Sequence, residues 1–251
     1  MDMGGSAALP KASDVLADEL RSLILGDAMP AGVPLPSEAL LIQQYGFSRG
    51  TVREALRLLE ADGLIVIRRG PKGGVRVRHP DVKQVSRSLA LLFSVRGIAL
   101  KDLFSFRKLI EPAAAAEAAR AATSEQRVWL TQLAPQHYGI QRGFRQSADF
   151  HGAIGRCSNN GVYEAILAAL HDALEWHSSD ESLSHDDIEA TQRAHVGIAK
   201  AILEGDSETA ARRMRSHLEQ FEQVLAEQGR LDEPIVPPDR WRRVQSRPRE
   251  P

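Results

Sequence analysis

The chain has 251 residues, of which 43% are hydrophobic and 26% are charged, and its formal net charge is −1. This length is enough for two domains, and no apolar run approaches the ~20 residues that a membrane helix needs, which excludes a membrane-spanning protein. The first residues lack the basic region and apolar core of a signal peptide, and the single cysteine, Cys157, cannot form an internal disulfide, so we expect a cytoplasmic protein.

The first expected elements are three short helices. Apolar residues recur at helical spacing from Ser13 until Gly26, and a turn rich in proline and glycine follows at residues 29–34. Ser37 precedes the next helix as an N-cap, and Ser48 precedes the third, because a serine hydroxyl can accept a hydrogen bond from a free N–H group of the first turn. The last two helices, joined by a tight turn, predict a helix-turn-helix, whose second helix enters the major groove of DNA.

The helix that starts after Ser48 has two different faces. Apolar residues lie on one side, and Arg49, Arg53 and Arg57 follow one another four apart on another. Residues 48–78 carry eight basic side chains against three acidic ones. A local positive patch on a nearly neutral chain suits contact with DNA phosphates.

A β-type run at residues 64–67, a glycine-rich turn and an alternating segment at residues 75–78 predict a two-stranded ribbon after the helices. A helix-turn-helix followed by a basic ribbon is a winged helix. Residues 13–79 resemble the DNA-binding domain of the GntR family of bacterial transcription regulators. The matching segments are residues 23–26, 30–32, 35–38, 48–56 and 59–64, together with Gly70.

The resemblance implies which residues contact DNA. In the family, the arginines at the positions of Arg49 and Arg53 and the wing glycine at Gly70 touch DNA, and we expect Ser48 and Thr51 to contact phosphates or base edges. The resemblance also implies a homodimer that places two recognition helices in successive major grooves of a palindromic operator in double-stranded DNA.

The chain departs from the family pattern at one position of this domain. Many members carry an arginine after the Pro-Ser-Glu step, where this chain has Ala39. The missing arginine removes one charge-assisted contact, so we expect an operator sequence and a salt dependence that differ from those of close relatives.

After a linker at residues 79–81, the pattern becomes helical throughout. The fold class that we expect is mainly α. A winged helix-turn-helix domain with a small β-ribbon wing is expected at residues 13–79, and an all-α effector-binding and dimerisation bundle at residues 84–228. Residues 229–251 are rich in proline and arginine and are expected to form a disordered tail. The helices of the bundle are expected at residues 84–95, 100–121, 124–134, 143–157, 161–178, 187–204 and 206–228.

Several polar residues of the bundle are candidates for a site. His151, His195 and His217 lie on three different expected helices, and imidazoles that project inward from separate helices form metal sites in bundles, although a lone histidine is more often a surface or hydrogen-bonded core residue. Arg107 either pairs with Glu111 on a solvent-exposed face or turns into the bundle, where a ligand carboxylate would be its partner. The remaining histidines of the bundle are interpreted as surface or packing residues: His137, His171, His177 and His185.

Residues 84–226 resemble the FCD effector domain of the FadR branch of the GntR family. The matching features are residues 103–112, 150–151 and 201–206, with Asn160, Met214 and Leu218. The resemblance implies a divalent metal, typically zinc, held by three histidines and an aspartate, and a small carboxylate effector that binds beside it with the help of an arginine. The matching positions are His151, His195, His217 and Arg107.

The aspartate is not matched. Ser147 stands four residues before His151, and the nearest carboxylate, Asp149, points about 200° away from His151 on a helix. A site of three histidines completed by water or by the effector's carboxylate is still chemically sensible for zinc.

These observations predict a ligand-responsive DNA-binding regulator and not an enzyme: a repressor that a small carboxylate releases from its operator. Two alternatives remain open. The bundle could sense zinc directly, or it could be a metal-dependent enzyme fused to a DNA-binding domain, since three histidines with an open position would allow catalysis. No general base is identifiable by spacing.

Overall fold

The computed structural model describes residues 10–68, 70, 73–134, 143–174 and 184–238, with the backbone alone for residues 143–148. The chain divides into two compact units, Met1–Gln84 and Val85–Pro251. None of the helices in the described ranges is long and apolar enough to cross a bilayer.

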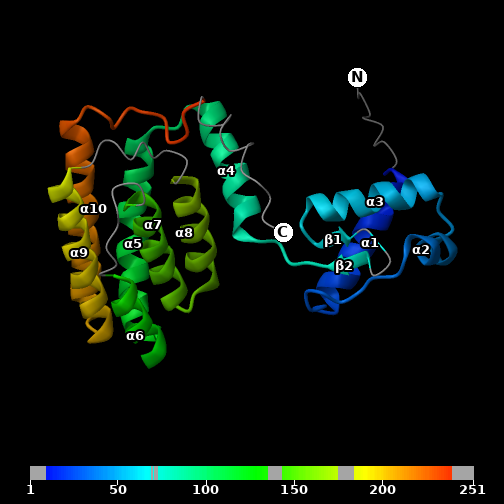
Figure 1. The fold of residues 1–251 in the computed structure, drawn as a ribbon, viewed down its shortest axis with the longest axis horizontal. Helices are drawn as coiled ribbons and strands as arrows, with labels where there is room; N and C mark the ends of the chain where they lie inside the picture. The colour runs from blue at the N-terminus through cyan, green and yellow to red at the C-terminus, as the bar shows by residue number, and fades with distance from the viewer. Residues whose placement is uncertain (1–9, 69, 71–72, 135–142, 175–183, 239–251) are drawn as a thin grey trace, which may run out of the picture. The chain divides into compact units, whose positions relative to one another are not determined.

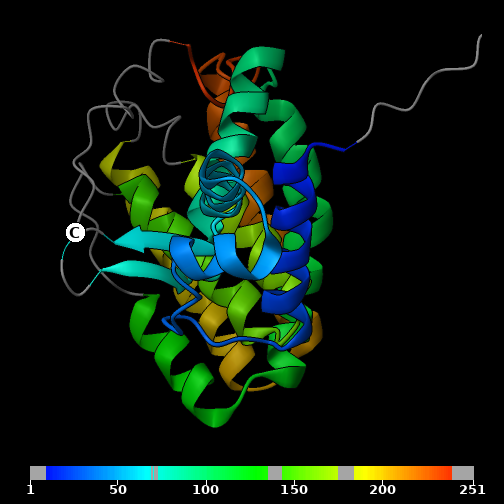
Figure 2. The same ribbon diagram turned by 90° about the vertical axis from the view of Figure 1, so that its right-hand side faces the viewer.

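The first unit is a winged helix. Its elements are α1 (Ala12–Gly26), α2 (Glu38–Tyr45), α3 (Arg49–Ala61), β1 (Ile65–Arg68) and β2 (Gly74–Val77). The two strands form a short antiparallel ribbon, seen as cyan arrows in Figure 2, with Ile65 opposite Val77 and Arg68 opposite Gly74. Among the described residues these are the two strands of the fold, as the alternating pattern predicts.

Local sequence signals set the helix-turn-helix. The hydroxyl oxygens of Ser37 and Ser48 accept hydrogen bonds from the backbone N–H groups of Leu40 (3.3 Å) and Thr51 (3.2 Å), so both expected N-caps are present. Gly46 ends α2 in the left-handed conformation at φ 71°, which a residue without Cβ adopts at little cost. The apolar side of α3 packs against α1 in a core that contains Leu16, Leu20, Val52, Leu56 and Leu59.

The second unit is an all-α bundle. Its helices are α4 (Val82–Arg96), α5 (Leu100–Ala121), α6 (Ser124–Leu133), α7 (Gly143–Cys157), α8 (Gly161–Leu174), α9 (His185–Leu203) and α10 (Ser207–Glu227). Figure 1 shows α5 and α7 in the middle of this unit, with α9 and α10 on one side and α8 on the other. The long helix α5 packs against α7, α9 and α10. Its buried alanines (Ala114, Ala115, Ala118 and Ala119) allow neighbouring helices to approach closely.

Arg127 on α6 connects the ends of two helices. Its guanidinium donates hydrogen bonds to the carbonyl oxygens of Ala119 (2.7 Å), Ala122 (3.0 Å) and Ile202 (2.6 Å). Carbonyl groups in the last turn of a helix have no partner inside the helix, and a cation there also interacts favourably with the helix dipole. One side chain therefore fixes the C-terminal end of α5 to that of α9.

The prediction of a disordered tail from residue 229 onward is wrong for its first part. The backbone N–H of Leu100 donates to the carbonyl of Glu233 (2.9 Å), and the N–H of Ile235 donates to the carbonyl of Ile98 (2.8 Å). Ile235 and Val236 are fully buried against α4, α5 and α8, and burying such side chains contributes about 1.5–3 kcal/mol each. Residues 239–251 lie outside the described ranges.

Candidate metal centre and DNA-binding surface

The residues expected to contact DNA lie on one end of α3 and in the loop of the wing. Ser48 and Arg49 are exposed at the start of α3, and the hydroxyl groups of Ser48 and Thr51 lie 2.9 Å apart. Arg53 is exposed one turn further, and its Nε donates to Glu38 Oε2 at 2.9 Å. Gly70 lies between the two strands at φ 103°, where a side chain would be strained. This arrangement leaves α3 with an accessible basic face opposite its apolar one.

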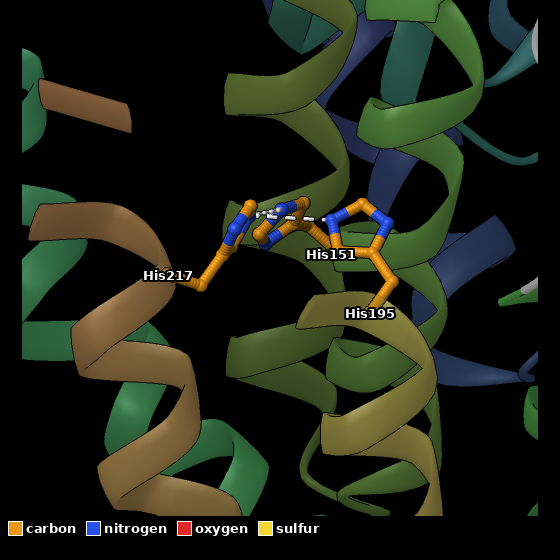
Figure 3. Close-up of side chains that lie close together, drawn as sticks. All are labelled: His151, His195 and His217. Atoms are coloured by element: carbon orange, nitrogen blue, oxygen red, sulfur yellow. Dashed lines mark hydrogen bonds between the residues drawn. The ribbon is translucent and has the colours of Figure 1, made fainter. Parts of the chain in front are cut away.

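The three candidate metal ligands converge in the second unit. Figure 3 shows His151 on α7, His195 on α9 and His217 on α10 turned toward one another. The Nε2 atom of His217 lies 3.2 Å from that of His195 and 3.3 Å from that of His151. All three side chains are buried, with exposed fractions of 1%, 0% and 5% in chain order. Three different helices thus bring three imidazole nitrogens close together.

These distances fit a metal ion. Two nitrogens that are each 2.0–2.1 Å from zinc in a tetrahedral site lie about 3.3–3.4 Å apart, which agrees with the two Nε2 separations. The Nε2 atom of His217 takes part in both contacts, and it carries at most one proton. One proton cannot satisfy three nitrogen lone pairs that point at the same place, whereas a cation can be bound by all three. The residues present therefore fit a divalent ion bound through three Nε2 atoms.

The imidazoles are held in the neutral form that a metal requires. Burial lowers the pKa of His151, and it lowers the pKa of His195 and His217 well below the usual value, with the neighbouring imidazoles adding to the effect in these two. His195 Nδ1 is buried without a hydrogen-bond partner among the described residues.

Arg107 and Glu111 form a pair, as one interpretation of the sequence expected, but the pair is buried and not on a solvent-exposed face. Arg107 Nε donates to Glu111 Oε1 at 2.5 Å, and Glu111 is 1% exposed. Burial alone would raise the pKa of Glu111, but Arg107, His151 and His171 together outweigh it and hold this pKa well below its usual range. Arg107 is therefore already paired with the carboxylate of Glu111 inside the bundle.

Sequence reasoning did not assign two residues to this site: His171, which it interpreted as a surface or packing residue, and Glu111, which it considered only as a partner of Arg107. His171 on α8 is buried, its Nε2 lies 3.1 Å from Glu111 Oε1, and its ring stacks on that of His151 with centroids 4.9 Å apart. The interpretation of His171 as an ordinary packing residue was incomplete. A histidine on the same helix face as Leu167 and Leu174, and a glutamate inside the apolar run before Pro112, were the signals that could have identified them.

No aspartate among the described residues takes the place of the expected fourth metal ligand. Asp149 is exposed on α7, on a different side from the buried His151. Ser147 lies in the same helix, one turn before His151, and its side chain is outside the described set. Among the described residues, the buried carboxylate beside the three histidines is that of Glu111.

Comparison with known proteins assigns both units. Residues 12–77 match the family described as bacterial regulatory proteins, gntR family, and residues 102–220 match the FCD domain. The Glc operon transcriptional activator of Escherichia coli strain K12 is 31% identical over 218 residues, which cover 82% of this chain and 85% of that protein. The chain belongs to the GntR family.

Other comparisons agree with this assignment. The HTH-type transcriptional repressor NanR of Escherichia coli (strain K12 / DH10B) is 30% identical to this GntR-family chain over 223 residues, covering 84% of the chain and 83% of NanR. The structure of Streptococcus agalactiae GntR has a TM-score of 0.61 at 23% identity and covers 84% of this chain and 99% of that one, which shows a shared fold. Both resemblances and the mainly α fold class are therefore confirmed. The protein is a ligand-responsive, DNA-binding transcriptional regulator, and its relatives are regulators, which fits a protein that is not an enzyme.

Proposed function

We propose that this GntR-family regulator is a cytoplasmic repressor that binds a palindromic operator as a homodimer and leaves it when a small carboxylate binds beside a metal ion in the FCD domain. The observation that carries the proposal is the convergence of the Nε2 atoms of His151, His195 and His217 inside the bundle. Zinc is the metal that three imidazoles and a tetrahedral spacing fit best.

The charge balance of the site supports an anionic effector. Three neutral imidazoles leave the charge of a divalent ion uncompensated, and the charge of Glu111 is already balanced by Arg107. Because Ser147 stands where an aspartate ligand is expected, the open position is available to a carboxylate from outside. When bound, the metal would act as a Lewis-acidic anchor for that carboxylate, while the outer nitrogens of Arg107 could steady it.

DNA release then requires that the effector bind the DNA-incompetent state more tightly. A difference of ~100-fold in effector affinity between the two states corresponds to about 2.7 kcal/mol of coupling. Direct zinc sensing is less favoured, because the FCD domain implies an effector ligand and the three-histidine site leaves a position for one.

The DNA-binding part of the proposal is tested with Arg53→Ala. DNA selected by the full chain from a random library would be titrated with wild type, Arg53→Ala and the control Arg120→Ala, which breaks an exposed pair in the other unit. Each of two subunits loses about 1–3 kcal/mol of contact, so we expect an affinity at least ~30-fold weaker for Arg53→Ala and unchanged for Arg120→Ala. Normal operator binding by Arg53→Ala would show that the recognition surface is misplaced.

The effector part is tested with a thermal-shift panel of hydroxy acids, sugar acids, dicarboxylates and aromatic acids, with added zinc and with chelator. A ligand at 100 times its Kd stabilises the protein by about 2.7 kcal/mol, which is several degrees for this chain length. A stabilising acid whose effect disappears with chelator, and which also releases the selected DNA, is the expected result. Release by zinc alone would instead support direct metal sensing.

A further inference from the structure

The carboxylate of Glu111 on α5 contacts side chains of two neighbouring helices, α7 and α8. Glu111 lies in the middle of α5, and it accepts hydrogen bonds from Arg107 on the same helix, from His151 Nδ1 on α7 (2.5 Å) and from His171 Nε2 on α8 (3.1 Å). With 1% exposure it has no access to solvent that could replace these partners. A buried carboxylate with three donors is a fixed acceptor in this bundle.

This acceptor determines where His151 carries its proton. An ionised carboxylate only accepts, so the imidazole nitrogen that faces it must bear the hydrogen, which places N–H at Nδ1. The lone pair of His151 is then at Nε2, the atom that lies 3.3 Å from His217 Nε2. The ring plane is held as well, because the His171 ring stacks on it at an interplanar angle of 18°.

We infer that Glu111 is the positioning residue of the metal centre: its carboxylate fixes the Nδ1–H tautomer and the orientation of His151, so that His151 Nε2 points at the ion between the three imidazoles. His171 supports this arrangement by holding the other oxygen of Glu111 and by stacking on His151. The inference rests on the metal site of the proposed function. Partners of this kind, which hold the outer nitrogen of a histidine ligand, typically change metal affinity 10–100-fold when they are removed.

Glu111, His151 and His171 are also close enough to form a metal cluster of their own. Two observations argue against a metal ion bound by these three residues. The guanidinium of Arg107 bonds the same carboxylate oxygen that His171 contacts, which places a positive charge where a second ion would lie. In addition, His151 Nδ1 cannot donate to Glu111 and bind a cation at once. Hydrogen bonding therefore describes this cluster better than metal ligation.

His195 provides an internal contrast. Its Nδ1 is buried with no hydrogen-bond partner among the described residues, whereas the Nδ1 of His151 meets Glu111. The ring of His195 stacks on that of Phe150, with centroids 4.2 Å apart, but of these two residues only His151 has a hydrogen-bond acceptor at Nδ1 that fixes its tautomer, as far as the described residues show. Loss of Glu111 should therefore weaken metal binding by releasing His151, without removing a ligand.

The test is a zinc competition titration against a chromophoric chelator, with the full chain as wild type, Glu111→Gln, Glu117→Gln and His151→Ala. Glu117 lies on the same helix in an exposed pair with Arg120, so its variant is the matched control. In Glu111→Gln, the new amide must turn its NH₂ group toward one of the three donors, which breaks the arrangement. We expect zinc affinity 10–100-fold weaker for Glu111→Gln than for wild type, one zinc per chain in both, and wild-type affinity for Glu117→Gln.

Two outcomes separate the inference from the proposal on which it depends. If His151→Ala loses zinc but Glu111→Gln binds it as tightly as wild type, Glu111 does not position the site, although the metal centre stands. If wild type binds no zinc, or His151→Ala binds it unchanged, the metal centre itself fails. Loss of a second zinc equivalent in Glu111→Gln would also overturn the inference, because Glu111 would then be a ligand.

Arg107 loses its partner in Glu111→Gln, so this variant could fail to fold. A measurement on the wild-type chain keeps the inference testable. Long-range ¹H–¹⁵N NMR of the zinc-free protein distinguishes the two neutral tautomers of His151, and we expect the proton on Nδ1. A proton on Nε2 would contradict the inference without any substitution.

Discussion

The close approach of α7 and α8 sets the position of His151 beside His171, and it depends on Gly155. A Cβ atom added at Gly155 would lie 3.0 Å from the carbonyl oxygen of Tyr163 and 3.3 Å from Glu164 Cα. Both are backbone atoms of α8, so they cannot move aside as the end of a flexible side chain would. Gly155→Ala must therefore push the two helices apart.

Gly152, one turn away on α7, is the matched control, because a Cβ there would meet nothing closer than Ala168 Cα at 4.0 Å. Both substitutions gain about 0.5–1 kcal/mol from replacing glycine inside a helix, and this gain cancels when the two variants are compared. Overpacking costs about 1–3 kcal/mol, so Gly155→Ala should be less stable than Gly152→Ala by about 2 kcal/mol. For a protein of this size, that difference is about 4–8 °C in Tm.

Tryptophan fluorescence reports on the second unit through Trp129 on α6, and the sequence of the first unit, Met1–Gln84, contains no tryptophan. Urea and thermal unfolding of the zinc-free chain would be followed for wild type and both variants. We expect Gly152→Ala to be slightly more stable than wild type and Gly155→Ala to be clearly less stable. Equal stability of the two variants would refute the reasoning, since it would mean that α7 and α8 do not approach at Gly155.

Three further predictions concern the bundle. Arg127→Ala should lower the free energy of unfolding by about 2–3 kcal/mol in urea, because the carbonyls at two helix ends lose a charged donor; an unchanged midpoint would contradict this role. Burial lowers the pKa of His171 to about 4, so the unfolded chain binds a proton there that the folded chain does not, and His171 alone should contribute a loss of up to about 3 kcal/mol of stability between about pH 6.5 and pH 4, in addition to the losses from His151, His195 and His217. In the presence of chelator, His171→Gln should flatten this fall while the exposed His185→Gln should not, and parallel curves would speak against it. Ser147→Asp should bind zinc more tightly than wild type and Ser147→Asn should not; equal affinities would show that position 147 does not reach the metal centre.

The DNA-binding unit was largely readable from the sequence. Caps at Ser37 and Ser48, the apolar stripe of α3 and the glycine of the wing act within a few residues, so local spacing predicts the structure that forms. The bundle helices were predicted for the same reason. The incomplete interpretation of His171 and the wrong expectation of disorder at residues 231–236 both concern segments whose surroundings come from distant parts of the chain.

The sequence by itself determined the helical bundle, the helix-turn-helix and the choice of the three candidate histidine ligands, the last through family resemblance. Only the tertiary structure decided that Arg107 and Glu111 are buried, that Glu111 meets His151 and His171, and that Arg127 joins two helix ends. The physical reason is the sequence separation between the residues in contact. Helix formation follows from contacts three and four residues apart, whereas the two histidine partners of the buried Glu111 lie 40 and 60 residues further along the chain and are set by how the helices pack.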